Sequence, residues 1–325
     1  MNVTERTDLG RTRGNDCSPL LFECRDTVTL EQSLDWVSRQ RETLVARAAA
    51  HGALLFRGFG VTSDHDFDAF IQAFGLPNFT YAESLSNAVR VNRTERVFTA
   101  NEAPPEAVID MHHEMAQTPV FPSRLFFFCE QAAAGGGETP LCRSDWLLDD
   151  LAAELPGFVA RCRELGVRYR NTMPAEDVAQ SGQGRSWAST LSVDSREAAE
   201  ARLAALGYDW EWLEDGSLRA ITPVLPAIRK MSDGREVFFN QLIAAYRGWK
   251  DAERAITFGD DSPFPRDDME RVCELAAEIT FDTPWESGDV VLVDNFLVMH
   301  GRRPFTGTRR VLASLVADDG SRLAA

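Results

Sequence analysis

The sequence has few histidines, no paired cysteines and no long apolar run. There are five histidines, and the six cysteines are scattered without a C-x-x-C pair, which favours free or buried thiols over disulfides or a zinc site. No stretch reaches the roughly 18 apolar residues needed to cross a bilayer. Residues 1–19 are polar and lack the apolar core of a signal peptide, so we expect a cytoplasmic protein without a membrane partner.

Positive charge is also scarce. The 34 lysines and arginines are outnumbered by 50 aspartates and glutamates, which gives a formal net charge of −16. Nucleic-acid binding needs clustered positive side chains, so this balance argues against a nucleic-acid partner. The hydrophobic fraction of 44% and the charged fraction of 26% are those of an ordinary globular protein with a substantial core.

The chain is expected to form one domain, because no repeat and no long low-complexity linker divides it. Residues 1–20 are expected to be a disordered arm and 21–325 a single domain. Helical spacing of apolar residues predicts a helix from Thr29 to about Ala50, and Ser63 or Asp64 can cap a second helix.

Strand patterns dominate much of the rest. Apolar runs predict strands near 53–58, 124–129, 290–293 and 309–316, while residues 144–163 and 195–206 have helical patterns. We therefore expect a mainly β protein of the α+β class. Helices should precede the β core, and a helical insert should occupy about residues 144–275.

One short run holds a histidine and a carboxylate two residues apart. Side chains alternate in an extended strand, so His112 and Glu114 should point to one face and His113 to the other. Iron(II) oxygenases use two histidines and one carboxylate, because O2 and a co-substrate must share the remaining metal positions. His300, which follows the strand at 290–293, can supply the third ligand. The pair alone does not separate this site from structural histidines.

An arginine pair follows His300 at the start of the last predicted strand. After the turn at 301–308, this strand can return alongside the histidine and bring an arginine with it. A guanidinium there could bind a carboxylate in a bidentate manner. Arg310 fits this role because an apolar strand follows it directly.

These residues lie within a series of spaced motifs. Together they resemble the TauD/TfdA family of iron(II)- and 2-oxoglutarate-dependent dioxygenases, and most of all its subgroup from nonribosomal-peptide biosynthesis, which includes a syringomycin-pathway aspartyl hydroxylase. The resemblance covers nearly all of the chain after residue 45. The matching segments are 51–59, 111–115, 136–140, 239–241, 288–295 and 300–307.

The resemblance implies a double-stranded β-helix, or jelly roll, decorated with helices. It implies that His112, Glu114 and His300 bind Fe(II), and that Arg310 and Thr139 bind 2-oxoglutarate. Taurine-cleaving members carry an arginine four positions after the one that binds 2-oxoglutarate. Ser314 stands at that position in this chain, so we do not expect taurine or another sulfonate as the substrate.

The resemblance further implies an enzyme that couples decarboxylation of 2-oxoglutarate by O2 to oxidation of an unactivated C–H bond. Glu114 argues against halogenation, since halogenases of the family lack this carboxylate. Hydroxylation is the expected outcome. Desaturation, cyclisation and epoxidation would use the same residues, and a non-catalytic metal-binding jelly roll is the alternative from another class.

The expected substrate is an amino acid or an amino-acid derivative in natural-product biosynthesis, either free or tethered to a peptidyl carrier protein. Three side chains are candidates for binding it: Tyr81, Arg170 and Asn240. A solvent-facing salt bridge would explain Arg170 equally simply, and Asn240 could instead satisfy backbone groups. The oligomeric state and the oxidised carbon stay open.

Overall fold

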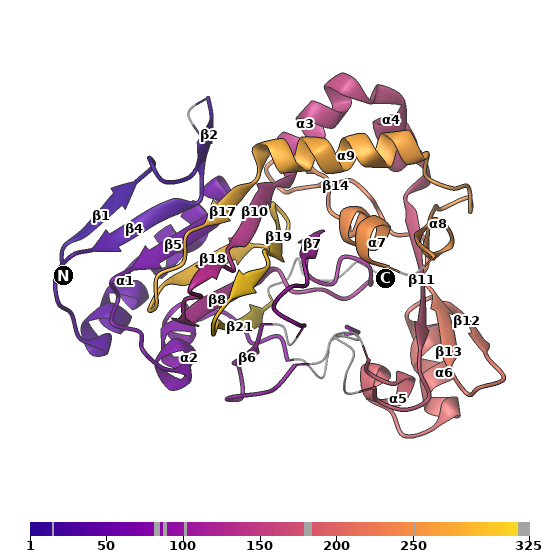
Figure 1. The fold of residues 1–325 in the computed structure, drawn as a ribbon, viewed down its shortest axis with the longest axis horizontal. Helices are drawn as coiled ribbons and strands as arrows, with labels where there is room; N and C mark the ends of the chain where they lie inside the picture. Colours follow the sequence, from indigo (N-terminus) through magenta and orange to yellow (C-terminus); the bar gives the residue numbers. More distant parts are fainter. Residues whose placement is uncertain are drawn as a thin grey trace.

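The computed structural model describes residues 1–14, 16–80, 85–86, 90–100, 103–178, 184–249 and 251–317. Two sheets pack face to face at its centre, as expected for a jelly roll (Figure 1). In the larger sheet β4 and β5 pair in parallel, and the other neighbours are antiparallel. Its strands, in spatial order, are β1 (Val3–Arg6), β4 (Leu20–Cys24), β5 (Ala53–Arg57), β18 (Val290–Asp294), β8 (Arg124–Gln131), β21 (Arg310–Val316) and β6 (Phe98–Thr99).

The smaller sheet carries the metal-site histidines. It is antiparallel throughout. In spatial order it contains β17 (Phe281–Thr283), β10 (Thr139–Arg143), β19 (Val298–Arg302) and β7 (Ile109–His112). Two short hairpins join β2 (Arg11–Arg13) to β3 (Asp16–Ser18) and β14 (Arg229–Lys230) to β15 (Glu236–Val237). Far apart in sequence, β9 (Gly135–Gly136) and β20 (Phe305–Thr306) form another antiparallel pair.

Central strands of the larger sheet are buried on both faces. In β18, Val290 and Leu292 join the core beneath the first two helices, whereas Val291 and Val293 face the space between the sheets. This explains why the strand reads as a continuous apolar run rather than as an alternating one. The helices against the outer face are α1 (Leu30–His51) and α2 (Asp64–Ala73).

Both of these helices begin where the sequence predicts. Thr29 and Ser63 are their N-caps, each accepting a hydrogen bond from the backbone three residues on within a capping box. Gly52 ends α1 with φ 77°, a conformation that costs glycine little. The prediction of both helices is confirmed.

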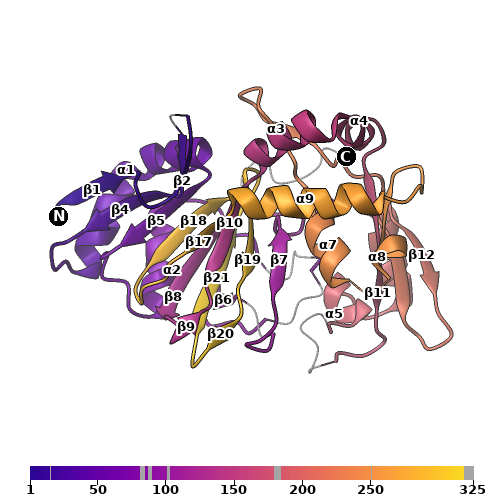
Figure 2. The same ribbon diagram turned by 45° about the horizontal axis from the view of Figure 1, so that its top comes forward.

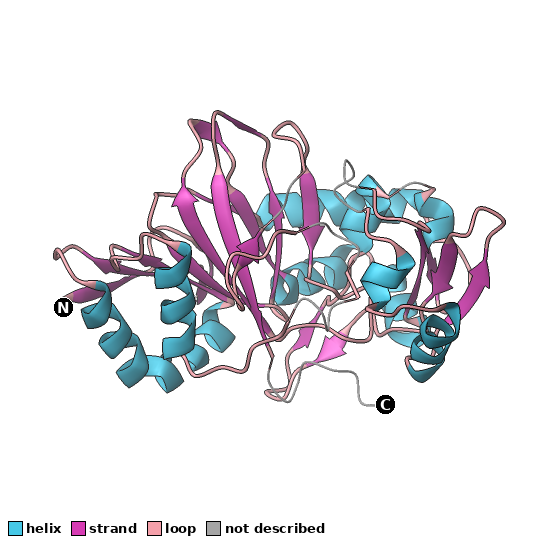
Figure 3. Cartoon of the chain, turned by 90° about the horizontal axis from the view of Figure 1, so that it is seen from below, coloured by secondary structure: helices cyan, strands magenta, loops and turns pink. Residues whose placement is uncertain are grey.

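A second group of helices covers the outer face of the smaller sheet (Figure 2). Its members are α3 (Ser144–Glu154), α4 (Pro156–Leu165), α7 (Leu242–Gly248) and α9 (Arg266–Ile279), and the short helix α8 (Ala252–Ala255) packs against α7. Figure 3 shows the strands of the two sheets lying between this group and the helices at the N-terminal side.

The insert holds more than the helices that the sequence predicts. Besides α5 (Trp187–Leu191) and α6 (Arg196–Ala205), it contains an antiparallel sheet. The strands of this sheet are β12 (Asp209–Trp212), β13 (Leu218–Ile221), β11 (Val167–Met173) and β16 (Ile256–Phe258). The description of the insert as helical is therefore incomplete: its helices are present, but its strands were missed because short strands with mixed polarity give little periodic signal.

The predicted disordered arm is also wrong. Residues 3–6 form β1 at the edge of the larger sheet, where they pair with β4 through the backbone. A polar edge strand of this kind buries few side chains, so its sequence resembles that of a loop. No helix in the described part of the chain is both long and apolar enough to span a membrane.

Candidate metal centre

His112 and His300 are directly opposite each other on neighbouring antiparallel strands. They are register partners between β7 and β19, and their ring centroids lie 4.4 Å apart. Residues facing each other across such a pair bring their side chains together on one side of the sheet. The pairing explains how two histidines 188 positions apart in sequence reach one site.

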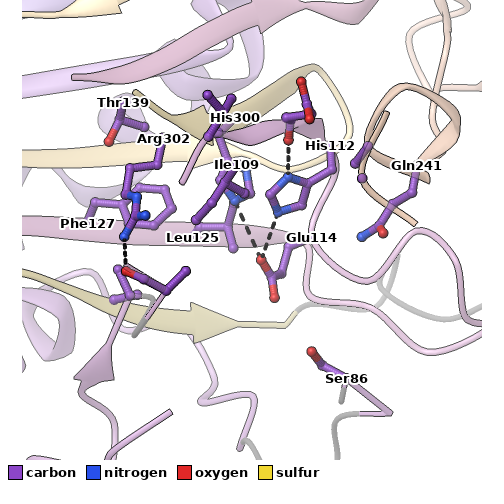
Figure 4. A pocket seen from close by; sticks show the side chains of 18 of the residues that line it. Ser86, Ile109, His112, Glu114, Leu125, Phe127, Thr139, Gln241, His300 and Arg302 are labelled. Atoms are coloured by element: carbon purple, nitrogen blue, oxygen red, sulfur yellow. Dashed lines mark hydrogen bonds and ion pairs between the residues drawn. The ribbon is translucent and has the colours of Figure 1, made fainter. Parts of the chain in front are cut away.

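Glu114 completes the group from a turn rather than from the strand. The β7 strand ends at His112, and the next residues turn so that the Oε2 of Glu114 lies 3.8 Å from Nε2 of His112 and 3.5 Å from Nε2 of His300. Figure 4 shows the three side chains pointing toward one another. One ligand atom from each lies within 4.8 Å of the others.

Asn295, just after β18, fixes the backbone of this turn. Its Oδ1 accepts a hydrogen bond from the Glu114 N–H at 2.8 Å, and its Nδ2 donates to the Glu114 carbonyl at 3.0 Å. Met115 follows with φ 58°, which is rare outside glycine and typical of functional sites. The turn therefore holds Glu114 against the histidines, and the backbone of Met115 is strained as a result.

The second oxygen of Glu114 has a different partner. Oε1 lies 2.8 Å from the guanidinium of Arg90, and both side chains are almost fully buried. Burial alone would raise the pKa of the Glu114 carboxyl, but Arg90 and the two histidines together hold it well below its usual value. Glu114 is thus an anion that presents one oxygen to the histidines.

The donor set suits a divalent metal ion. Nδ1 of His112 hydrogen-bonds the Asp110 carbonyl at 2.8 Å, which leaves its Nε2 as the acceptor that faces Glu114. Burial, with His112 nearby, lowers the pKa of His300 to about 4, so this imidazole is neutral at pH 7. Two imidazole nitrogens and one carboxylate oxygen match the facial set of non-haem iron(II) enzymes.

His113 lies away from this group. Its ring is fully buried, with Nδ1 at the Asn295 carbonyl and Nε2 near the Ser144 hydroxyl and the Phe238 carbonyl. Burial lowers the pKa of His113 to about 3, so the ring is neutral. Its hydrogen bonds tie the metal-site turn to the surrounding core.

The three candidate ligands line a pocket of about 260 Å³. Thr139 and Gln241 lie on opposite sides of them in Figure 4. The polar residues that line the pocket besides the three ligands are Ser86, Arg90, Asp110, Gln117, Thr139, Gln241, Trp249, Arg302 and Arg309.

Thr139 lies where the resemblance placed it, at the start of β10 on the pocket wall. Its Oγ1 accepts hydrogen bonds from Nε1 of Trp285 at 3.1 Å and from the guanidinium of Arg309 at 3.4 Å. Arg309 also donates to the Gly137 carbonyl at 2.7 Å. Burial lowers the pKa of Arg309 to about 10, so it remains a cation at pH 7. Among the described residues it has no carboxylate partner.

The placement of Arg310 in this pocket is wrong. Its side chain is 57% exposed and pairs with Glu130 at 2.9 Å, on the other side of β21. A β-bulge lies between Arg310 and Val311, and the face shared with Val311 and Ala313 is the one that lines the pocket. Arg309, not Arg310, is therefore the arginine beside Thr139.

The structure also separates two substrate candidates from the pocket. Arg170 pairs with Asp261 and donates to Oγ1 of Thr257 at 2.9 Å, so it is used in a salt bridge of the insert. Asn240 is buried and bonds backbone groups of Ala227 and Leu242, which is the alternative that the sequence left open. Tyr81 lies outside the described residues.

Sequence reasoning missed several residues of the pocket, among them Arg90, Gln241 and Arg309. Gln241 is the neighbour of Asn240, lines the pocket and donates to the His113 carbonyl at 2.9 Å. Arg90 is far from Glu114 in sequence, and no spacing rule relates them. The alternation of β21 was the one signal for Arg309, and it was ambiguous because both faces of this strand are buried.

Comparison with known proteins identifies a family for the chain. Residues 16–315 match the family described as "Taurine catabolism dioxygenase TauD, TfdA family". A clavaminate synthase-like protein of Arabidopsis thaliana is 41% identical over 284 residues, 86% of each chain. The dapdiamide synthesis protein DdaC of Enterobacter agglomerans is 30% identical over 282 residues, 82% of each chain.

Two solved structures support the fold. PvcB of Pseudomonas aeruginosa superposes with a TM-score of 0.53 at 14% identity. The superposition covers 94% of this chain and 87% of PvcB. A structure described as PvcB, an Fe, alpha-ketoglutarate dependent oxygenase from an isonitrile synthetic pathway, superposes with a TM-score of 0.52 at 14% identity and covers 92% of this chain and 85% of its own. The chain belongs to the TauD/TfdA family. It is an enzyme, an oxygenase that uses Fe(II), 2-oxoglutarate and O2.

Proposed function

We propose that this oxygenase hydroxylates an unactivated C–H bond of an amino acid or amino-acid derivative in natural-product biosynthesis. The observation that carries the proposal is a pocket in which Glu114 and two histidines lie near a cation, Arg309, that has no carboxylate partner among the described residues. The relation to DdaC, a dapdiamide synthesis protein, supports a biosynthetic role.

In this proposal His112, Glu114 and His300 hold Fe(II). When bound, the iron supplies activation of O2 coupled to decarboxylation of 2-oxoglutarate. Arg309 binds the remote carboxylate of 2-oxoglutarate as a charge-assisted pair, and the Thr139 hydroxyl, oriented by Trp285, supports it. A carboxylate in this position would also neutralise a buried positive charge.

Glu114 directs the geometry of the metal site. Because Arg90 occupies Oε1, one oxygen is left to face the histidines, which keeps the carboxylate from using two metal positions. Positions for the co-substrate and for O2 then remain open. The presence of Glu114 is also the reason to propose hydroxylation over halogenation.

The pocket suits a substrate that carries both charges of an amino acid. Arg90, which pairs with Glu114, and the acidic Asp110 both line the pocket. Four positions after Arg309 stands Ala313, which also lines the pocket, so no arginine is available there for a sulfonate. We propose an amino-acid-like substrate, free or presented by a peptidyl carrier protein.

Succinate release against a panel of amino acids, each free and as a carrier-bound thioester, tests this function. We expect release above the substrate-free rate for at least one member of the panel, with the product heavier by one oxygen atom in mass spectrometry. A product lighter by two hydrogens would replace hydroxylation by desaturation. Release that no amino acid stimulates in either form would refute the substrate class.

A further inference from the structure

A second cavity adjoins the metal pocket inside the insert. Gln117 and Trp249 line both spaces, so they form the common wall. The second space, here named the insert cavity, has a volume of about 40 Å³. Since one water needs roughly 10–15 Å³ on this measure, the cavity has room for about three non-hydrogen atoms.

The insert cavity carries polar groups that lack partners. The Oε1 of Gln117 is buried and accepts no hydrogen bond from any described residue. Tyr208 and Asn171 also line the cavity, and neither side chain hydrogen-bonds a described residue. Burial alone accounts for the raised pKa of the Tyr208 phenol. An unsatisfied buried oxygen such as that of Gln117 is costly, so a ligand that donates a hydrogen bond to it would gain affinity. The half-buried side chains of Tyr208 and Asn171 can bond the same ligand.

The rest of the lining is apolar or already satisfied. Leu191, Leu203 and Met173 supply hydrophobic surface, and Thr222 uses its hydroxyl to accept the Tyr169 N–H at 3.1 Å. None of the described residues that line the cavity carries a charge. An ionised ligand would lose its hydration here without gaining a counter-ion, which disfavours carboxylates and ammonium groups.

A hydrogen-bond path joins the cavity to the metal site. The hydroxyl of Tyr169, which lines the cavity, accepts the Gln241 N–H at 2.9 Å. The side chain of Gln241 in turn donates to the carbonyl of His113, between two of the candidate metal ligands. The cavity is thereby held in a fixed position relative to the metal site.

We propose that the insert cavity is a second substrate subsite, which binds a short uncharged group on an apolar stem, at the end of the substrate remote from the metal. The group must offer a donor for Gln117 and an acceptor for the Tyr208 hydroxyl. A primary carboxamide has both and contains three non-hydrogen atoms. The inference rests on the proposed function, because it assigns one end of the substrate of that same site.

Small probes test the binding step directly. The full chain, loaded with zinc(II) and 2-oxoglutarate, is titrated with propionamide, propionate and propylammonium, and binding is followed by saturation-transfer NMR. Ala220 lines the cavity, so Ala220→Leu should fill it. We expect propionamide to bind the wild-type protein and not Ala220→Leu. For propionate and propylammonium we expect no binding that Ala220→Leu abolishes. Equal binding of all three probes, or propionamide binding that survives Ala220→Leu, overturns the proposal.

A gentler variant covers the case in which Ala220→Leu does not fold. Tyr208→Phe removes one hydroxyl and should weaken propionamide binding by about 2- to 10-fold, as expected for one neutral hydrogen bond. Tyr246→Phe is the matched control, because the Tyr246 hydroxyl bonds Glu270 outside both spaces. Unchanged propionamide affinity in Tyr208→Phe overturns the assignment of this hydroxyl and with it the subsite.

The substrate role is tested with L-glutamine, L-glutamate and L-ornithine, each free and as a pantetheine thioester. Glutamine should stimulate succinate release more than glutamate or ornithine does. Tyr208→Phe should lower the ratio of the glutamine-stimulated rate to the other two rates by about 2- to 10-fold. The proposal is overturned if glutamine does not stimulate succinate release, or if Tyr208→Phe leaves the ratio of these rates unchanged. If the wild-type protein binds no 2-oxoglutarate with iron(II), the proposed function itself has failed; if it does bind, only the subsite has failed.

Discussion

The two oxygens of Glu114 have separate partners, and this division defines the site at the scale of single residues. Oε2 faces both histidines, while Oε1 pairs with Arg90 in a nearly water-free environment. A buried carboxylate needs such compensation, since an unpaired charge there would be strongly destabilising. The arrangement keeps Glu114 ionised and ready to bind a cation.

The arginine pair before the last strand gives a sharp test at this scale. Arg309→Ala should weaken 2-oxoglutarate binding by about 10- to 100-fold, the loss expected for charge-assisted hydrogen bonds. Arg310→Ala is the matched control, because its side chain is exposed and pairs with Glu130. Anaerobic titration of the iron(II) protein with 2-oxoglutarate measures both. A larger loss of 2-oxoglutarate affinity in Arg310→Ala than in Arg309→Ala would instead assign 2-oxoglutarate binding to Arg310.

The neighbouring histidines should differ in a second test. His112→Ala should abolish stoichiometric metal binding. His113→Ala should retain metal binding but lower the free energy of unfolding by about 3 kcal/mol, because it leaves a cavity and removes the hydrogen-bond partner of two buried carbonyl groups. His65→Ala, on the surface, is the control for stability. Metal content and urea unfolding are the measurements. Loss of metal from folded His113→Ala would contradict the assignment.

At the scale of elements, the strand β21 shows where sequence reasoning reached its limit. Its last residues alternate between two buried faces, so both faces carry apolar side chains and period-two patterning gives no direction. The β-bulge after Arg310 changes the alternation further. For these reasons the arginine pair was predictable, but which member enters the pocket was not.

Other elements were predictable because their signals are local. The capping boxes at Thr29 and Ser63 fix the starts of α1 and α2 from a few adjacent residues. Two of the three metal ligands are histidines, of which the chain has only five, so few candidates had to be considered. By contrast, β1 is held mainly by backbone pairing with β4, and the pairing of Arg90 with Glu114 depends on the tertiary fold.

The connection from β18 to the Glu114 turn depends on one amide side chain. Asn295→Ala would leave the N–H and carbonyl of Glu114 and the carbonyl of Pro122 without this partner. We expect a loss of about 3 kcal/mol in unfolding free energy and metal affinity lower by about 10- to 100-fold. Asn92→Ala, at an exposed position, is the control. Wild-type metal affinity in Asn295→Ala would show that the turn keeps its shape unaided.

At the scale of the whole molecule, the site joins the two sheets of the core. His112 and His300 belong to the smaller sheet, while Asn295 and Arg309 flank strands of the larger one. Ligands that bind such a junction should stabilise the folded chain as a unit, because unfolding either sheet disrupts the site.

Ligand-linked stability is the corresponding test. Iron(II) and 2-oxoglutarate together, each at about 100 times its dissociation constant, should add roughly 5 kcal/mol and raise Tm by about 8 °C. Anaerobic thermal unfolding with and without the two ligands measures this shift. His300→Ala should show no shift under the same conditions. An equal shift in the variant would place the stabilising site elsewhere.

The central claim is that His112, Glu114 and His300 hold iron(II) in a position where 2-oxoglutarate chelates it. The most direct measurement is the visible charge-transfer band of the iron(II)–2-oxoglutarate chelate, recorded without oxygen. The wild-type protein should show the band, and His112→Ala and His300→Ala should lack it. Absence of the band from the wild-type protein, or its persistence in both variants, would contradict the account.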